Sequence, residues 1–230
     1  MAEAEDVITD VARHATVYAQ DLWRRHRGAP AGPPAVRLAD VARRLDLLIA
    51  AVFGRSFALR VAQPPAPPTW LGGVFLRQRI PPVRAAVPMT DGHSLWLPAA
   101  FGLAESADDA TARFRTLALQ QAMRAVRCSA LQCPFDGPLL LRELYLLLEA
   151  RAADDALVRL LPGLAEPLQL LRRQALRRRP ALSAFAVPHR ALESLVRSLL
   201  AGSESPALLL PATPAEVLAQ ATQLAGTMAV

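Results

Sequence analysis

Cysteines, histidines and a cluster of arginines are the side chains of this sequence that could do chemistry. Cys128 and Cys133 are the two cysteines, and their C-x4-C spacing differs from the C-x2-C of zinc sites and redox-active motifs. The spacing allows a disulfide, but we expect two reduced thiols of a cytoplasmic protein. No two histidines lie four residues apart, so we expect surface or packed side chains and no metal ligands at His14, His26, His93 and His189.

The arginine cluster at 172–179 is basic enough to be considered as a nucleic-acid patch. All 26 basic residues of the 230-residue chain are arginines, and the formal net charge is +6. No aromatic residues alternate with the cluster, although stacking on aromatic rings is typical of single-strand binding. We therefore expect a solvated helix face or a contact for an acidic protein partner, with nucleic-acid binding as the alternative. The residues concerned are Arg172, Arg173, Arg177, Arg178 and Arg179.

Motifs of nucleotide-binding proteins and hydrolases are missing from the sequence, which has no P-loop, no G-x-G-x-x-G and no G-x-S-x-G. The first ten residues include four acids and no apolar run, so we see no signal peptide. The longest apolar stretch is interrupted by Arg142 and Glu143, and it is shorter than the ~20 residues of a membrane helix. We expect a soluble cytoplasmic protein with no cofactor, no catalytic residues and no membrane insertion.

Hydrophobic periodicity predicts helices over most of the chain, with a small sheet between them. Alternating apolar residues predict strands at 57–62, 83–87 and 94–97, and Thr90-Asp91-Gly92 predicts a turn between the last two. Prolines at 64–68 predict a stiff, extended connector. Gly54 and Ser106 are typical of a helix end and a helix start. The predicted helices are 5–27, 38–52, 106–126, 139–161, 166–178, 188–200 and 214–225.

The predicted fold class is therefore mainly α with a small β-sheet (α+β). We expect a single domain, because no repeat of fixed period is present. Its parts would be an N-terminal helix and linker at 1–36, a helix plus small sheet at 37–105, and a helical bundle at 106–230.

Four strings in the middle of the chain resemble the N-terminal domain of the NorD/CbbO family, which contains nitric oxide reductase activation proteins and Rubisco activase adaptors. The strings are FALRVAQPPAPP at 57–68, MTDGHSLWLP at 89–98, RFRTLALQQAMRA at 113–125 and LYLLLEARAADDALVRLLPGL at 144–164. The likeness covers about residues 39 to 225, and T-D-G-x-x-[IL]-[WY]-L-P is its most specific string. Family members continue into a C-terminal von Willebrand A domain, so the resemblance implies a fragment or a naturally short protein.

The resemblance implies a non-catalytic adaptor domain that docks on a hexameric MoxR-type AAA+ ATPase. The client enzyme of this chaperone-like complex would be Rubisco, which acts in carbon fixation, or nitric oxide reductase, bound through the missing C-terminal domain. We expect the arginine cluster at 172–179 to contribute to docking through carboxylates on the ATPase ring. Trp70 is a second candidate contact, with burial in the core as the alternative for this side chain.

The resemblance also implies a degenerate metal site. Relatives can carry a sequence close to H-E-x-x-H after the T-D-G string and an E-D-x-R on a later helix, as in zinc metallopeptidases. The matching positions here are Gln120, Gln121 and Arg124, with Glu149 downstream. Arginine cannot ligate a cation and glutamine cannot act as a general base, so a zincin-like scaffold would be inactive. A polar patch between two helices is the alternative for these residues, and a zinc-dependent metallopeptidase-like hydrolase is the alternative function.

Overall fold

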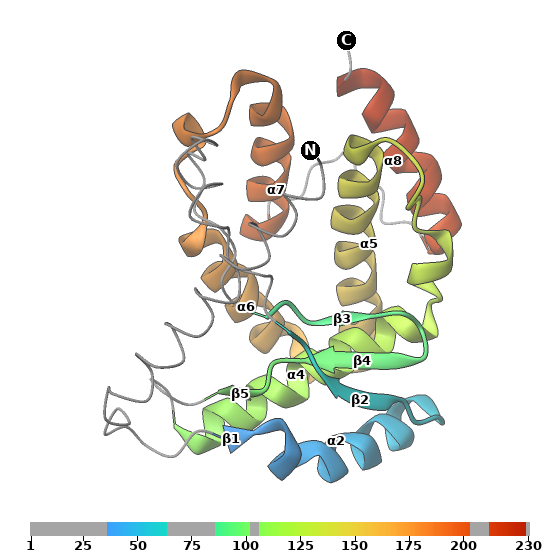
Figure 1. The fold of residues 1–230 in the computed structure, drawn as a ribbon, viewed down its shortest axis with the longest axis vertical. Coiled ribbons are helices and arrows are strands. Elements are labelled where there is room, and N and C mark those ends of the chain that lie inside the picture. Colours follow the sequence, from blue (N-terminus) through green and yellow to red (C-terminus); the bar gives the residue numbers. More distant parts are fainter. Residues whose placement is uncertain (1–35, 64–85, 102–105, 203–211, 229–230) are drawn as a thin grey trace, which may run out of the picture.

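The computed structural model describes residues 36–63, 86–101, 106–202 and 212–228, which form a mainly helical fold with a small sheet (Figure 1). The expected α+β class is confirmed. The predicted helix at 5–27, the proline connector at 64–68 and Trp70 lie outside the described residues. The helices are α2 (Leu38–Phe53), α4 (Ala107–Val126), α5 (Leu139–Leu160), α6 (Ala165–Arg178), α7 (Arg190–Ala201) and α8 (Pro214–Met228), with 3₁₀ turns η1 (Ser129–Gln132), η2 (Pro162–Leu164), η3 (Leu182–Ala184) and η4 (Val187–His189).

Local signals explain where the first two long helices begin and end. The Arg37 backbone N–H donates to Oδ2 of Asp40 at 3.0 Å at the start of α2. Gly54 ends this helix with φ +68°, a left-handed conformation that favours glycine, and its N–H donates to the Ala50 carbonyl at 2.9 Å. Ser106 Oγ accepts the Asp109 N–H at 3.1 Å at the start of α4. Both predicted boundary residues are therefore confirmed.

The sheet contains β2 (Ala58–Val61), β3 (Met89–Thr90) and β4 (Ser94–Leu97) in the order β2-β4-β3. Strand β2 runs parallel to β4, and β3 runs antiparallel to it. A separate short ladder pairs β1 (Val36–Arg37) with β5 (Ala100–Phe101). The predicted strand at 83–87 is wrong in its described part, because 86–88 is irregular and the strand is Met89–Thr90. Pro88 cannot donate a ladder hydrogen bond, and pairing begins only after it.

The predicted Thr90-Asp91-Gly92 turn is confirmed, and its side chains close it. Thr90 Oγ1 accepts the Gly92 N–H at 3.0 Å and donates to the Ser94 carbonyl at 2.8 Å. Asp91 Oδ1 accepts the N–H groups of His93 (2.8 Å) and Ser94 (2.7 Å), and these bonds, with that from Ser94 the largest cause, lower the pKa of Asp91. Gly92 has φ +92°. The most specific string of the resemblance thus has a structural role as a hairpin.

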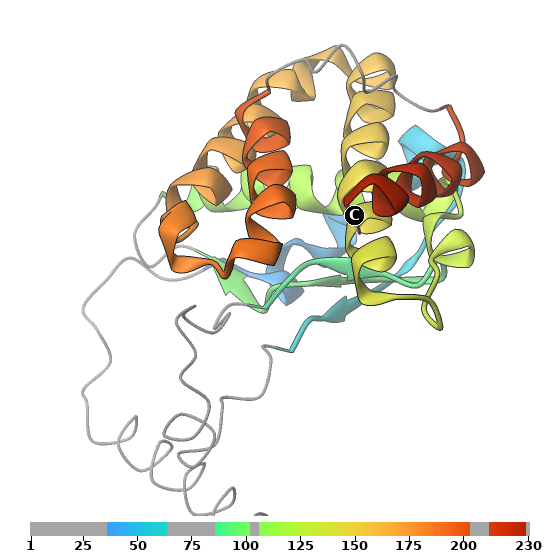
Figure 2. The same cartoon turned by 90° about the horizontal axis from the view of Figure 1, so that it is seen from above.

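Two apolar clusters hold the helices to the sheet and to one another. In Figure 1, α2 lies below the sheet and α4, while α5 to α8 lie above them. The view from above shows the sheet along one side of α4 (Figure 2). The first cluster joins α2, the sheet, α4 and the second half of α5; its fully buried members include Ile49, Leu95 and Phe114. The second joins the first half of α5 to α7 and α8, around Tyr145 and Val217. Helix α5 belongs to both clusters; the single domain stays a prediction.

Candidate functional site

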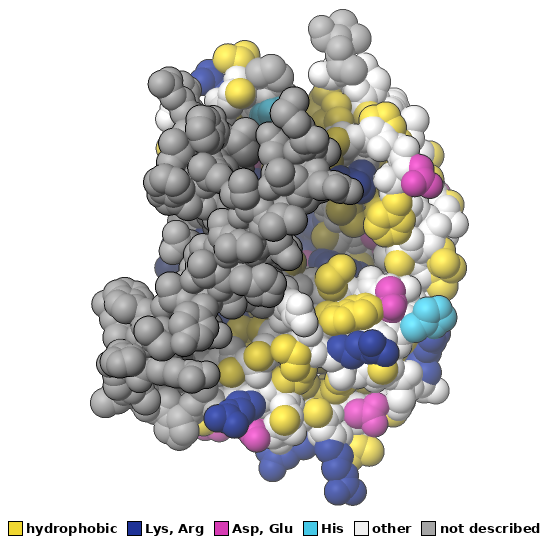
Figure 3. Space-filling model, viewed as in Figure 1, with side chains coloured by type: hydrophobic (Ala, Val, Ile, Leu, Met, Phe, Trp, Pro, Cys, Tyr) yellow, Lys and Arg dark blue, Asp and Glu magenta, His cyan; other side chains and the backbone are white. Residues whose placement is uncertain are grey.

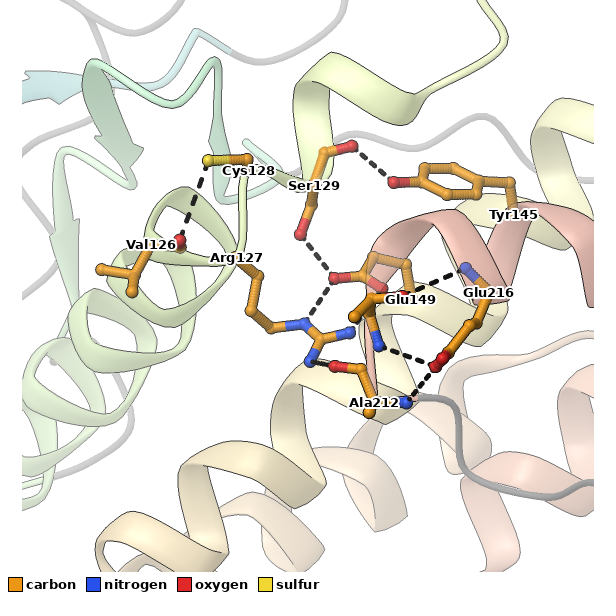
Figure 4. A network of polar contacts seen from close by, with 9 residues as sticks. Val126, Arg127, Cys128, Ser129, Tyr145, Glu149, Ala212 and Glu216 are labelled. Atoms are coloured by element: carbon orange, nitrogen blue, oxygen red, sulfur yellow. Dashed lines mark hydrogen bonds and ion pairs between the residues drawn. The ribbon is translucent and has the colours of Figure 1, made fainter.

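The C-terminal end of α4 carries an arginine that binds a buried carboxylate of α5 (Figure 4). Nε of Arg127 donates to Oε1 of Glu149 at 2.7 Å, and Nη2 donates to Oε2 at 3.0 Å. Ser129 Oγ also donates to Oε1 of Glu149, at 2.6 Å. Only 3% of Glu149 is exposed, so both oxygens of a buried carboxylate have donors within the protein.

The same arginine extends this contact to the start of α8. Nη1 of Arg127 donates to the Ala212 carbonyl at 2.9 Å. Glu216 Oε2 accepts the N–H groups of Ala212 (2.8 Å) and Thr213 (3.1 Å), which satisfies backbone donors at this helix start (Figure 4). Arg127 therefore connects three helices.

A second polar cluster lies on the next turns of α5 and joins α4 to α6. Gln120 Nε2 donates to Oδ1 of Asp154 at 2.6 Å, and Arg172 Nη2 donates to Oδ2 of Asp154 at 2.9 Å. Asp154 is 5% exposed. The neighbouring Asp155 accepts from Arg151 Nε at 2.7 Å on its outer side. Each carboxylate in this cluster therefore has an arginine or glutamine partner of its own.

Arg124 lies within reach of the charges of both clusters but hydrogen-bonds to neither. Its Nε is buried and unpartnered, and its guanidinium donates to no residue that the structure describes. Burial lowers the pKa of Arg124, and the nearby Asp154 and Glu149 carboxylates oppose this shift. Arginine stays protonated at neutral pH nevertheless. A cation is thus partly buried here without a hydrogen-bonding counter-ion.

The structure gathers some of the predicted metal-site positions and separates others. Gln120 and Arg124 share a pocket with Asp154, whereas Glu149 is bound to Arg127. Gln121 is 2% exposed, and its Oε1 has no hydrogen-bond partner. In the four described ranges, no three His, Cys, Asp or Glu side chains are grouped as metal ligands would be.

Asp154 and Arg127 are central residues of the two polar clusters, and the sequence analysis missed both. Glu149 and Asp154 are charged side chains within the apolar run of α5, and acids at such positions need buried partners. The sequence therefore indicates that these acids need partners, but it does not predict which residues the partners are.

The five arginines at 172–179 divide into two half-buried residues that form ion pairs within the fold and three exposed residues, and a docking role for any of them stays a prediction. Arg172 binds Asp154, and Arg179 Nε donates to Oε1 of Glu193 at 2.8 Å. Glu193 is 2% exposed, and the bond from Arg179 lowers its pKa. These two arginines therefore have carboxylate partners within the fold. The exposed arginines of the cluster are Arg173, Arg177 and Arg178, all on α6.

Both cysteines are free thiols; Cys128 is exposed, and partial burial raises the pKa of Cys133.

Within the described residues, no helix combines the length and apolar character that a bilayer crossing requires. No protein-family model, curated protein or solved structure matches the chain.

Proposed function

We propose that the chain is a non-catalytic adaptor module that binds other proteins. The observation that carries this proposal is how the side chains at the peptidase-like positions are bonded. The amide N–H of Gln120 is donated to Asp154, Glu149 is bound by Arg127, and position 124 bears a cation. A zinc ion needs ligands with free lone pairs, and a general base must be free to accept a proton. A cation at position 124 and a carboxylate already bound by Arg127 suit a zinc ion poorly, and this favours the adaptor over the hydrolase alternative.

The partner in this proposal is a hexameric MoxR-type AAA+ ATPase, and the support for it is the resemblance of the four sequence strings. The contact surface would be the exposed arginines of α6. Arg173 and Arg177 are four residues apart and lie on one face of the helix, and Arg178 is adjacent. Three exposed cations suit carboxylates on a protein partner and steer association. They also make a smaller basic patch than the five arginines of the sequence, which weakens the nucleic-acid alternative.

Co-purification tests the proposal. The chain is co-expressed with a MoxR-type ATPase from its own genome, and the complex is measured by size-exclusion chromatography and by titration. We expect a stable complex whose affinity falls about tenfold or more when Arg173, Arg177 and Arg178 are all changed to Glu.

The control is charge reversal at Arg43 and Arg44, two exposed arginines of α2, which lies below α4 in Figure 1 whereas α6 lies above it. This variant lowers the net charge by four, against six for the variant of α6, and should bind as the wild type does. No complex with the wild-type chain would refute the adaptor proposal, and equal binding by both variants would refute the docking surface. Rubisco or nitric oxide reductase is the proposed client, and the identity of the neighbouring genes distinguishes them.

A further inference from the structure

A pocket of about 200 Å³ lies where α4, α5, α6 and α7 meet, and the unpartnered Arg124 lines it. Aliphatic side chains form much of the wall, among them Leu147, Leu171 and Leu200. Basic side chains are visible beside α5 on the face drawn in Figure 3, which is seen from the same side as Figure 1. A cavity of about 150 Å³ is large enough for benzene, so this pocket has room for a small organic molecule.

The charges around the pocket do not balance locally. Glu149 is bound by Arg127 and Ser129, Asp154 by Gln120 and Arg172, and Asp155 by Arg151. By contrast, the guanidinium of Arg124 donates no hydrogen bond to any described carboxylate. The Nε atom of Arg124 is buried without a hydrogen-bond acceptor, although the residue as a whole is only partly buried. Burying a polar group without a partner is costly, and such groups in a folded protein are often functional.

We infer that this pocket is a binding site for a small aliphatic carboxylate. The carboxylate would accept hydrogen bonds from the Arg124 guanidinium, whose planar donors match its two oxygens. The aliphatic part of the ligand would lie against the leucine wall, as in most small-molecule sites, which combine apolar walls with a few polar groups. This inference depends on Arg124 and the leucine wall and not on the exposed arginines of α6, and it stands whether or not the chain binds an ATPase.

Saturation-transfer NMR with sodium hexanoate as the probe tests the inference, with 1-hexanol as the uncharged control. We expect saturable binding of hexanoate and much weaker binding of hexanol. Arg124→Gln should weaken hexanoate binding about ten- to a hundredfold, which is the contribution of a charge-assisted hydrogen bond. The matched control is Arg115→Gln, an exposed arginine of the same helix, which should bind hexanoate as the wild type does.

A second variant keeps the guanidinium and fills the space instead. Ala175 lines the pocket but is exposed on α6, so Ala175→Phe should leave the core intact and abolish hexanoate binding. Circular dichroism verifies that each variant is folded. Absence of saturable binding by the wild-type chain would overturn the inference. So would equal binding of hexanol, preference for inorganic phosphate over hexanoate, or unchanged binding by both Arg124→Gln and Ala175→Phe.

Discussion

Substitution by methionine should lower the free energy of unfolding strongly at Arg127, just after α4, and hardly at all at Arg124, within α4. Arg127→Met removes both hydrogen bonds from the guanidinium to Glu149 and the bond to the Ala212 carbonyl. Glu149, 3% exposed, keeps only Ser129 as a donor. Breaking a buried ion pair by removing one partner typically costs about 3–5 kcal/mol, because the other charge is left buried and uncompensated. For a chain of this length, that loss lowers Tm by about 6–20 °C.

Arg124→Met removes a guanidinium that hydrogen-bonds to no described residue. The substitution gives up attraction to Asp154 and Glu149 but also ends the desolvation of an unpartnered charge. We expect the free energy of unfolding to stay within about 1 kcal/mol of the wild-type value or to rise. The two variants therefore separate an arginine that stabilises the fold from one that does not.

Urea unfolding followed by circular dichroism measures both variants, with Glu149→Gln alone and combined with Arg127→Met completing a double-mutant cycle. The Gln amide oxygen can still accept from Ser129 and carries no charge, so the double variant should recover most of the stability lost by Arg127→Met. The reasoning is refuted if Arg127→Met costs less than about 1 kcal/mol, or if Arg124→Met costs as much as Arg127→Met.

Two further predictions concern other parts of the fold. The Arg179 hydrogen bond holds the pKa of Glu193 below its ordinary value of 4.5, so the stabilisation is fully present above that value and is lost as pH falls through the lowered pKa. The Tm difference between the wild type and Glu193→Gln should therefore shrink from about pH 6 to about pH 3, and a difference that grows on acidification would contradict the assignment. Gly92→Ala should cost about 1–2 kcal/mol in urea unfolding, because φ is +92° and no neighbouring atom lies within 4 Å of the added Cβ, which leaves backbone strain as the sole cost. Gly163→Ala, at a glycine with open space and no positive φ, is the control for that measurement and should be nearly neutral.

Local structure could be predicted from the sequence where the signal lies within a few residues. The spacing of Leu38, Val41, Leu45 and Ile49 is that of the buried face of α2, and the capping residues Gly54 and Ser106 occupy the predicted positions. The strand before the hairpin was misplaced because Val83 to Val87 has strand-forming composition. Pairing with β4 instead selects Met89 and Thr90, and this depends on the register of the turn.

The candidate site could not be predicted in the same way, because its contacts join residues far apart in sequence. Arg127 and Glu149 are separated by 22 residues, and Gln120 and Asp154 by 34. Helical spacing placed Gln120 and Arg124 on one face correctly, but it could not show which acid of α5 each would meet. The choice depends on how α4 crosses α5, and that crossing is determined by the packing of both apolar clusters.

The hairpin between β3 and β4 bears on how sequence likeness is used for proteins of this kind. Each residue of the turn meets one of its requirements. The Thr90 hydroxyl hydrogen-bonds across the turn, the Asp91 carboxylate accepts two backbone N–H groups, and Gly92 has no Cβ. Any protein with the sequence Thr-Asp-Gly at this place can form the same hairpin turn, whatever the rest of its sequence. A sequence match at these residues therefore indicates a shared backbone conformation and not a shared binding partner. Knowledge of binding partners has to come from residues that the bend does not need, such as the arginines that face outward from α6.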